Sequence, residues 1–373
     1  MNKTFLAGAV ALLMSSAATS LYSQAYTFSD VVKVQATPVK NQASSGTCWS
    51  YATAAFLESE LLRTGKGEHD ISEMFAVRIN YLNKMNDNYL RQGKGNLGQG
   101  SLAHMFTNIV KEHGMVPQEA YNGINYDSKL NNHRELNKYI NAFSAASVEL
   151  KQKSSQYYIL AEAIMDTYLG KVPDKFTYKG KEYTPESFAN EMALNMNDYV
   201  EITSLSHIPF YEESVIEVPD NWDFGRFFNV PLDEFMAIID NALTTGYSVC
   251  WDGDVSEKGF SHKNGVAINP VEESREEALK FEKIFPEIKV DQKIRQAGYE
   301  NFTTTDDHLM LLTGISKDQN GNKYYITKNS WGTERNNFGG YLNMSESFVR
   351  AKSISIMVHK NSIPKDIRKK LKF

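Results

Sequence analysis

The sequence predicts an α+β protein with two lobes, a helical lobe followed by a lobe built on a β-sheet or a β-barrel. Two observations predict this fold class. Apolar residues recur at helical spacing between residues 48 and 114, whereas short β-rich runs separated by turn signals prevail after residue 247. With 373 residues, of which 42% are hydrophobic, the chain is long enough for one large core or two modest domains.

Three helices are expected in the first lobe. The apolar spacing predicts them over residues 48–65, 72–85 and 101–114. Ser72 and Ser101 are the expected N-caps of the second and third helices, because a serine hydroxyl can accept a hydrogen bond from a free backbone N–H of the first turn. Each of these helices carries one apolar face, so the first lobe is predicted to be a packed helical unit.

Residues 125–230 are interpreted as an inserted, largely helical subdomain. Helical patterns cover 134–150 and 156–169, and they lead to a hairpin at 176–183. Thr184 then has the character of an N-cap for one more helix. No motif in this segment could be tied to chemistry.

The second lobe is predicted to start after an amphipathic helix at 232–242. Its strands are expected at 247–251, 309–315, 324–327, 341–344 and 353–358. The charged stretch 272–300 is interpreted as a helical excursion. The C-terminal tail, 363–373, is basic and amphipathic, which is typical of a solvated helix face and less often of a segment that binds a membrane or nucleic acid.

Residues 1–25 are predicted to be a signal peptide. Lys3 gives a basic start, an uncharged apolar run follows at 5–14, and residues 23–25 form a small-x-small cleavage site. The apolar run is too short to cross a bilayer, for which about 20 residues are needed. We therefore expect an exported bacterial protein, periplasmic or secreted, with its folded domain at 26–373 and no membrane span after signal removal. A buried N-terminal helix is the alternative.

Charge and cysteine content exclude some classes of function. A net charge of −5 argues against a nucleic-acid-binding surface. Cys48 and Cys250 are the two cysteines, too few for a disulfide scaffold, although a bridge between them is the alternative to two free thiols. The histidine and cysteine spacings match no metal site, so no metal or other cofactor is expected.

Four residues of complementary chemistry occur in a fixed order along the chain. Cys48 stands where a helix begins, His308 and Asn329 follow far downstream, and Gln42 precedes the cysteine by six residues. A cysteine nucleophile, a histidine base and an asparagine that orients the imidazole are typical of a cysteine peptidase. Gln42 could donate its side-chain amide to the oxyanion that forms during acyl transfer.

The glycine-rich stretch 93–100 literally contains G-x-G-x-x-G. A dinucleotide-binding interpretation requires a preceding strand, and here a helix precedes it. A loop whose backbone can approach a ligand is the better interpretation.

The chain resembles the papain superfamily of cysteine peptidases in residues 39–51 and 308–341. It departs from the papain pattern in two places: Ser45 stands where papain-type enzymes have a cysteine, and His308 lies much farther downstream than the usual distance of roughly 130–150 residues. The motif-free segment 125–230 accounts for most of that excess.

Three stretches make the chain similar to the bleomycin hydrolase and aminopeptidase C branch of that superfamily. They are Ser-Ser-Gly-Thr-Cys-Trp at 44–49, Asn-Val-Pro-Leu-Asp at 229–233 and Cys-Trp-Asp-Gly-Asp-Val at 250–255. The resemblance implies a papain-like two-lobed fold, with a helical left lobe and a β-barrel-like right lobe. It also implies an aminopeptidase that acts on peptide N-termini.

The same resemblance implies roles for further residues. Gly98, Gln99 and Gly100 would line the cleft, and Trp331 would shield the contact between the histidine and the asparagine. The C-terminal carboxylate of Phe373 would lie in the cleft and bind the α-amino group of the peptide substrate. Members of this branch often assemble into hexamers through inserted helices, so a homo-oligomer is expected, although the branch is typically cytosolic.

Two alternatives remain open from the sequence. One keeps the nucleophile but has an open cleft, as in an endopeptidase or a dipeptidase. The other is a catalytically silent, peptidase-like scaffold that binds peptides; the presence of all four residues argues against it.

Overall fold

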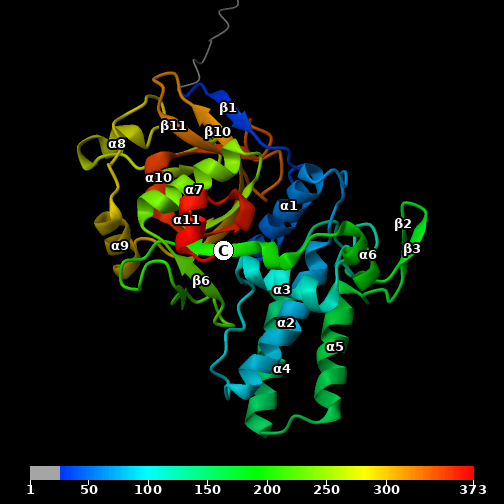
Figure 1. Cartoon of the computed structure of the whole chain (residues 1–373). Coiled ribbons are helices and arrows are strands. Elements are labelled where there is room, and N and C mark those ends of the chain that lie inside the picture. Colours follow the sequence, from blue (N-terminus) through cyan, green and yellow to red (C-terminus); the bar gives the residue numbers. More distant parts are fainter. Residues whose placement is uncertain (1–25) are drawn as a thin grey trace, which may run out of the picture.

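The computed structural model describes residues 26–373, and the predicted signal peptide at 1–25 lies outside the described residues. Figure 1 shows a lobe that contains the sheet and a helical lobe that extends below it and to one side. Helix α1 (Cys48–Arg63) packs against the sheet and against the helices α2 and α3. The two predicted lobes are therefore both present, and α1 lies between them.

The sheet lobe is built on one mixed sheet of eleven strands. Its order is β5-β6-β4-β13-β7-β10-β11-β12-β9-β8, with β1 paired to β10, and most neighbours are antiparallel. The strands are β1 (Ser29–Lys33), β4 (Tyr199–Thr203), β5 (Glu213–Val215), β6 (Arg226–Asn229), β7 (Val249–Gly253), β8 (Phe260–Ser261), β9 (Val266–Ala267), β10 (His308–Lys317), β11 (Lys323–Lys328), β12 (Tyr341–Ser345) and β13 (Ser353–His359).

Strand β10 separates the two largest hydrophobic cores. Leu309 and Leu311 belong to the core that contains α1, whereas Met310 and Leu312 belong to the core that contains α7 (Leu232–Thr244). This division follows from the two-residue period of a strand, in which successive side chains point to opposite faces. The strand is thus held from both sides, and its first residue, His308, is held with it.

The helical lobe contains the three expected helices with small changes at their ends. Helix α2 (Glu73–Leu90) starts after Ser72, whose hydroxyl accepts from the Phe75 backbone N–H as predicted. Helix α3 (Ala103–His113) has Leu102 at its N-cap and no side-chain cap. The predicted Ser101 cap is wrong because the Ser101 hydroxyl accepts a hydrogen bond from the Trp222 indole instead.

The first part of the segment 125–230 is largely helical and shares the hydrophobic core of the helical lobe. It contains α4 (Arg134–Leu150), α5 (Ser155–Leu169), the hairpin β2 (Phe176–Tyr178) and β3 (Lys181–Tyr183), and α6 (Pro185–Met192). Helix α6 begins with a capping box on Thr184. After η1 (Met196–Asp198), however, β4 joins the main sheet beside β13, and β6 and β5 extend the sheet from it. The predicted boundary at residue 230 is wrong in this respect.

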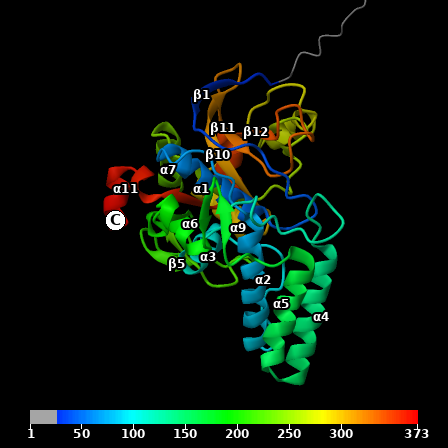
Figure 2. The same ribbon diagram turned by 90° about the vertical axis from the view of Figure 1, so that its right-hand side faces the viewer.

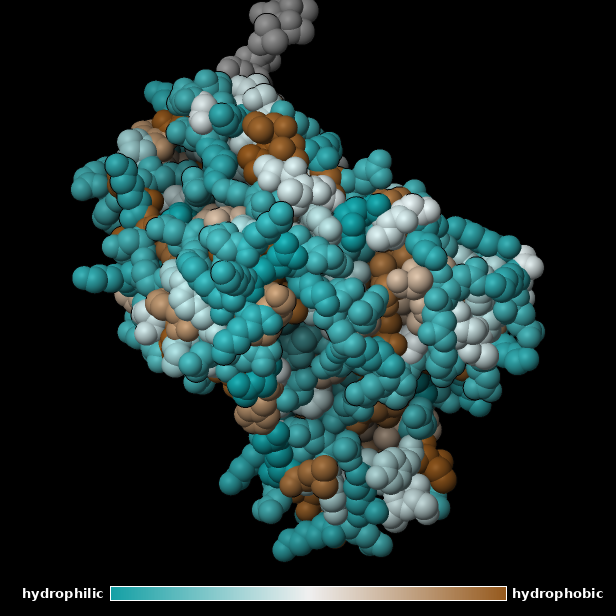
Figure 3. Space-filling view, in the orientation of Figure 1, coloured by the Kyte–Doolittle hydropathy of each residue, from teal (hydrophilic) through white to brown (hydrophobic). Residues whose placement is uncertain are grey.

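Helices α4 and α5 form a long antiparallel hairpin that projects away from the sheet lobe, with α2 beside it (Figure 2). Large hydrophobic side chains are exposed along this projection, and Figure 3 shows brown patches on its lower part. The exposed apolar residues are Leu90, Tyr139, Leu150, Tyr158, Ile159 and Leu160. The hairpin therefore buries one apolar face against α2 and leaves others open in a single copy of the chain.

The remaining helices are short and lie around the sheet lobe. They are η2 (Glu272–Ser274), α8 (Arg275–Ala278), α9 (Gln292–Glu300), α10 (Glu346–Lys352), η3 (Lys360–Ser362) and α11 (Lys365–Lys370). No helix among residues 26–373 combines the length and the apolar character needed to cross a membrane.

The C-terminal tail packs on the outside of the sheet lobe. Ile363, Ile367 and Leu371 are buried in the core that contains α7, so the apolar face of the tail is already covered. The Phe373 ring packs edge-on against Phe228 of β6, with 4.6 Å between the ring centroids. Because its apolar face is buried, this segment cannot insert that face into a membrane in the folded protein.

The loop at 216–226 is fixed to the start of α3 by a buried charge cluster. The His104 imidazole lies 2.9 Å from Asp223 and 3.3 Å from Glu201. Burial opposes a charge on His104, but the hydrogen bonds to the two carboxylates outweigh it and raise the pKa of His104 to about 9. Gly225 lies so close to the imidazole that a Cβ there would come within 2.3 Å of it.

We expect the His104→Gln substitution to destabilise the protein more at pH 6 than at pH 9.5. The folded-state pKa of His104 lies above its usual value, so the stabilisation is complete below about pH 6.5 and is lost as the pH rises through about 9. The difference in the free energy of unfolding between wild type and variant should shrink by about 2–3 kcal/mol over this range. Urea titrations at several pH values measure it, and a difference independent of pH would contradict the charged imidazole.

Candidate active site

Cys48 is the first residue of α1, and its sulfur faces the start of β10. The Leu309 backbone hydrogen-bonds the Cys48 thiol, which places the sulfur next to the residue that follows His308. Cys48 is 8% exposed, at the point where the pocket meets the core. As the first helical residue, it also has no acceptor within the helix for its own backbone N–H.

His308 is oriented by the asparagine predicted from the sequence. Its Nε2 lies 2.8 Å from Asn329 Oδ1, just beyond the end of β11. The Trp331 ring packs on the imidazole, with the centroids 4.9 Å apart and an interplanar angle of 34°. Nε2 is therefore the ring nitrogen that Asn329 holds, and Nδ1 is the other ring nitrogen of His308.

A second histidine, His262, forms a hydrogen bond with the amide group of Asn329. Its Nδ1 lies 3.3 Å from Asn329 Nδ2, and its ring packs edge-on against Trp331. A neutral His262 accepts this hydrogen bond and so directs the amide oxygen of Asn329 towards His308. Burial lowers the pKa of His262, with the nearby Arg335 charge adding to the effect, and this favours the neutral acceptor. No spacing pattern in the sequence distinguishes His262 from the other histidines.

Gln42 lies in the same pocket, and its amide orientation is fixed by two neighbours. Ser330 Oγ donates to Gln42 Oε1 over 2.6 Å, and Gln42 Nε2 donates to the Ser45 carbonyl over 2.8 Å. One of the two N–H bonds of the amide is used in this way, and the other remains free for a ligand. The segment 329–331 therefore orients both His308 and Gln42.

Burial dominates the protonation of the two reactive groups. It raises the pKa of the Cys48 thiol to about 12, opposed by the Leu309 backbone hydrogen bond and reinforced by the Asp220 charge. It lowers the pKa of His308 to about 4, against the opposing effect of the hydrogen bond that His308 Nε2 donates to Asn329 Oδ1. The ligand-free protein thus favours a neutral thiol beside a neutral imidazole.

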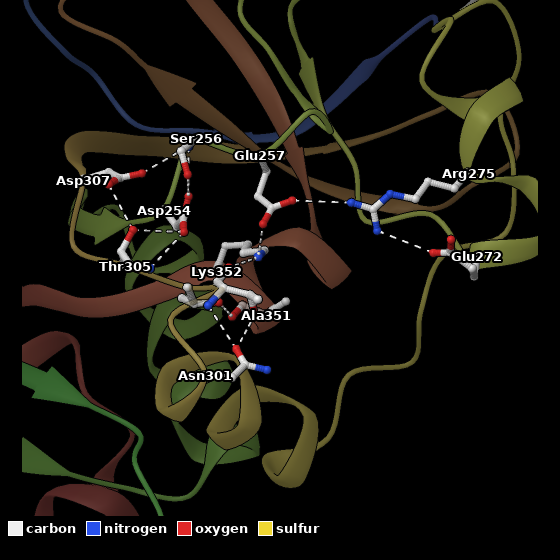
Figure 4. A network of polar contacts seen from close by, with 12 residues as sticks. Asp254, Ser256, Glu257, Glu272, Arg275, Asn301, Thr305, Asp307, Ala351 and Lys352 are labelled. Carbon is white, nitrogen blue, oxygen red and sulfur yellow. Dashed lines mark hydrogen bonds and ion pairs between the residues drawn. The ribbon is translucent and has the colours of Figure 1, made fainter.

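The carboxylates of the two aspartates before His308 interact with residues other than His308. Asp307 accepts from the Ser256 backbone N–H and the Thr305 hydroxyl, both over 3.1 Å, as Figure 4 shows. Asp306 shares a hydrogen bond with the buried Asp252, and burial together with neighbouring carboxylates raises the pKa of Asp306 to about 7. Asn329 is therefore the residue that holds the His308 ring by a hydrogen bond.

A pocket with a volume of about 410 Å³ joins these groups. It is lined by Gln42, Gly46, Cys48, Gln99, Gly100, Asn137, Asp220, Val255, Asp307, His308 and Trp331. The residues come from both lobes, so the pocket lies where the lobes meet.

The structure brings together some of the predicted ligand-binding residues and separates others. Gln99 and Gly100 line the pocket, and the Gln99 side chain accepts from the Gly46 backbone N–H over 2.7 Å. Gly98 lies outside the lining, with its carbonyl bound by Lys84 Nζ at 2.9 Å. The prediction for Phe373 is wrong in this structure, because its ring is packed on Phe228 and it does not line the pocket.

Cys250 is a free thiol inside the core and plays no part in the pocket. It is 1% exposed, and its sulfur lies 3.8 Å from the Thr53 hydroxyl. Both cysteines are free, so the alternative of a bridge between them is wrong.

We expect the His262→Ala substitution to slow the alkylation of Cys48. Removal of the acceptor frees the Asn329 amide to rotate, and misplacement of a catalytic group costs roughly 10- to 100-fold in rate. The second-order rate constant with iodoacetamide at pH 7, followed by mass spectrometry of the labelled cysteine, measures the effect.

His262→Gln keeps an acceptor in reach and should recover part of that rate. His113→Ala, at an exposed histidine of α3, is the matched control and should react as the wild type does. An unchanged rate in His262→Ala would contradict the role of His262.

Comparisons with known proteins show the family and the fold of this chain. Residues 83–373, which include His308 and Asn329 but not Cys48, match the Peptidase C1-like family. Aminopeptidase C of Lactococcus lactis subsp. cremoris is 22% identical over 372 residues, which cover 88% of this chain and 82% of that protein. Mitochondrial cysteine proteinase 1 of Saccharomyces cerevisiae (strain YJM789) is 23% identical over 394 residues, covering 92% and 79%.

The crystal structure of PepW from Lactobacillus rhamnosis HN001 superposes with a TM-score of 0.73 at 19% identity, over 94% of this chain and 86% of that one. This likeness confirms the predicted papain-like fold. The chain therefore belongs to the peptidase C1-like family, on the aminopeptidase C branch of the papain superfamily, and is a cysteine-type peptidase.

Proposed function

We propose that this protein is an exported aminopeptidase that removes residues from the N-termini of short peptides through Cys48, His308 and Asn329. The observation that carries the proposal is that Cys48, His308 and Gln42 line one pocket, with Asn329 bound to His308 Nε2 at 2.8 Å. Aminopeptidase C is the name of relatives whose sequences align with most of this chain.

The first step is attack of the Cys48 sulfur on the carbonyl carbon of the scissile peptide bond. Because burial keeps both groups neutral, the thiol proton passes to His308 Nδ1 as the carbon–sulfur bond forms. Asn329 accepts from Nε2 and holds the ring in one orientation as the imidazolium forms.

The negative charge moves to the carbonyl oxygen during this attack. Two donors lie at the pocket for it, the free N–H of the Gln42 amide and the backbone N–H of Cys48 at the start of α1. The Ser330 hydroxyl fixes the amide so that its nitrogen, and not its oxygen, faces that position. A preorganised donor of this kind contributes roughly 10²–10³-fold in rate.

His308 then returns its proton to the leaving amine, and the peptide bond breaks to give a thioester on Cys48. A water molecule gives a proton to the same imidazole and attacks the thioester, which releases the carboxylic acid and restores the thiol. The Trp331 ring on the imidazole keeps the contact between His308 and Asn329 away from water.

A pair of fluorogenic substrates tests this function, one with a free α-amino group and one identical but N-acetylated. We expect the free-amine substrate to be hydrolysed and the blocked one to react at least about 100-fold more slowly. Cys48→Ala should lose at least about 1,000-fold of the rate, because the nucleophile is gone. The matched control is Cys250→Ala, which removes the other thiol and should keep the activity.

An endopeptidase with an open cleft is the second candidate. It is favoured by one observation, that the chain's own C-terminus packs on Phe228 and leaves the pocket unblocked. Equal hydrolysis of both substrates would favour it and contradict the aminopeptidase. Full activity of Cys48→Ala would contradict both.

We also propose that the chain is exported after removal of residues 1–25. The described fold begins at Tyr26, which is 5% exposed and packs with Phe28 and Tyr324. Expression of the full chain in a bacterium, fractionation and mass determination of the N-terminal peptide test this. A mature N-terminus at or near Tyr26 in the exported fraction is expected, whereas an intact Met1 in the cytosol would contradict it.

A further inference from the structure

An aminopeptidase needs a group that recognises the charged α-amino end of its substrate. The expected group was the C-terminal carboxylate of Phe373, but that residue packs on the outer side of the sheet lobe against Phe228. Another anion at the pocket is therefore required if the enzyme selects free N-termini.

Asp220 lies where such a group is needed. Its carboxylate lines the same pocket as Cys48 and His308, and it is close enough for its charge to raise the pKa of the Cys48 thiol. Oδ2 lies directly over Gly100, where an added Cβ would come within 2.5 Å of the Asp220 carboxylate carbon. Gly100 thus gives the carboxylate room at the wall of the pocket.

The Asp220 carboxylate forms few hydrogen bonds or ion pairs with the described part of the protein. Its one side-chain hydrogen bond within the described residues is a long contact of 3.5 Å from Asn96 Nδ2 to Oδ1. No ion pair to it occurs within 4.0 Å among residues 26–373. Lys84, whose charge acts on Asp220, donates instead to the carbonyls of Gly98 and Gly100. Burial raises the pKa of Asp220 against the opposing charge of Lys84, so a bound cation would stabilise the carboxylate.

The loop that carries Asp220 is held rigidly. Asn96 Nδ2 donates to the Pro219 carbonyl over 2.7 Å, and the Trp222 indole donates to Ser101 over 3.2 Å. The His104–Asp223 contact described above fixes the same loop. A carboxylate held in place before the substrate arrives loses little entropy on binding a cation.

The position of Asp220 also fits the acyl side of the substrate. His308 delivers its proton to the leaving amine, and Trp331 packs on that imidazole, so the leaving part lies towards Trp331. Asp220 lies at the wall formed with Gly100. The acyl part, which ends in the free amino group, extends towards this second wall.

We propose that Asp220 binds the protonated α-amino group of the peptide substrate and so selects free N-termini close to the scissile bond. The inference deepens the proposed aminopeptidase function and rests on it. Because Asp220 lines the same pocket as Cys48, the amino group that it binds lies close to the cleaved bond.

This contact has a second consequence for the nucleophile. The Asp220 charge disfavours the Cys48 thiolate in the free enzyme. A substrate ammonium beside Asp220 offsets that charge, so binding of the correct substrate makes the thiol easier to ionise. A blocked N-terminus brings no such charge.

The Asp220→Asn substitution tests the proposal with the same pair of free-amine and N-acetylated substrates. Loss of one charge-assisted contact should lower kcat/KM for the free-amine substrate by about 10- to 100-fold. The blocked twin, measured on the same variant, should change by less than about 3-fold or react faster. The rate with the N-acetylated substrate reports on whether the catalytic groups are intact. A variant that failed to fold would lose activity towards both substrates.

Glu217→Gln is the matched control, since it removes one carboxylate from the same loop at an exposed site paired with His207. It should leave both rates as in the wild type. A third variant lacking Phe373 compares the two possible anions, and it should keep the preference for a free amine.

The outcomes separate the two proposals. If the wild type hydrolyses both substrates equally, the aminopeptidase function fails. If the wild type requires a free amine and Asp220→Asn keeps that requirement, the function stands and the role of Asp220 is overturned. Loss of the requirement on removal of Phe373 alone would also overturn it.

Discussion

The packing of the start of α1 against the start of β10 is the constraint on which the rest of the site depends. It sets Cys48 beside the peptide that links His308 to Leu309, although the two reactive residues lie far apart in sequence. Alternating apolar side chains bury β10 on both faces, so the strand has little freedom to slide. The packing of the two cores therefore sets the position of Cys48 relative to His308.

The short segment 329–331 extends that constraint across the pocket. Asn329 holds the base, Ser330 sets the Gln42 amide, and Trp331 covers the imidazole. Strand β11 is paired along its length with β10 and β12, and this pairing fixes the point and the direction in which the segment 329–331 leaves the sheet. Three consecutive residues at the end of one strand thus serve three different tasks, and His262 supports them from the opposite side.

Much of the fold was predictable from the sequence because local periodicity governs it. The helices of the first lobe and the strands after residue 247 appear close to their expected bounds. The incorrect predictions concern features that are determined by contacts between residues far apart in the sequence. Ser101 was expected to cap α3 but pairs with Trp222, and residues 199–229 join the sheet through β13, which no local pattern reveals. Cys48, His308, Asn329 and Gln42 carried a recognisable order, whereas His262 and Asp220 matter only through their neighbours in space.

The burial of Cys250 has a practical consequence for the labelling of the protein with thiol reagents. Its sulfur lies in the core, on the β7 side of α1, while the sulfur of Cys48 lies at the wall of an open pocket. In the native state the two thiols therefore differ in access to solvent, and in urea they become equal. Label taken up before unfolding thus reports on Cys48 in folded molecules, and the further uptake on unfolding counts the molecules in which Cys250 was buried. In a folded preparation, the ratio of the two gives the fraction of molecules with a reactive Cys48 without use of a substrate.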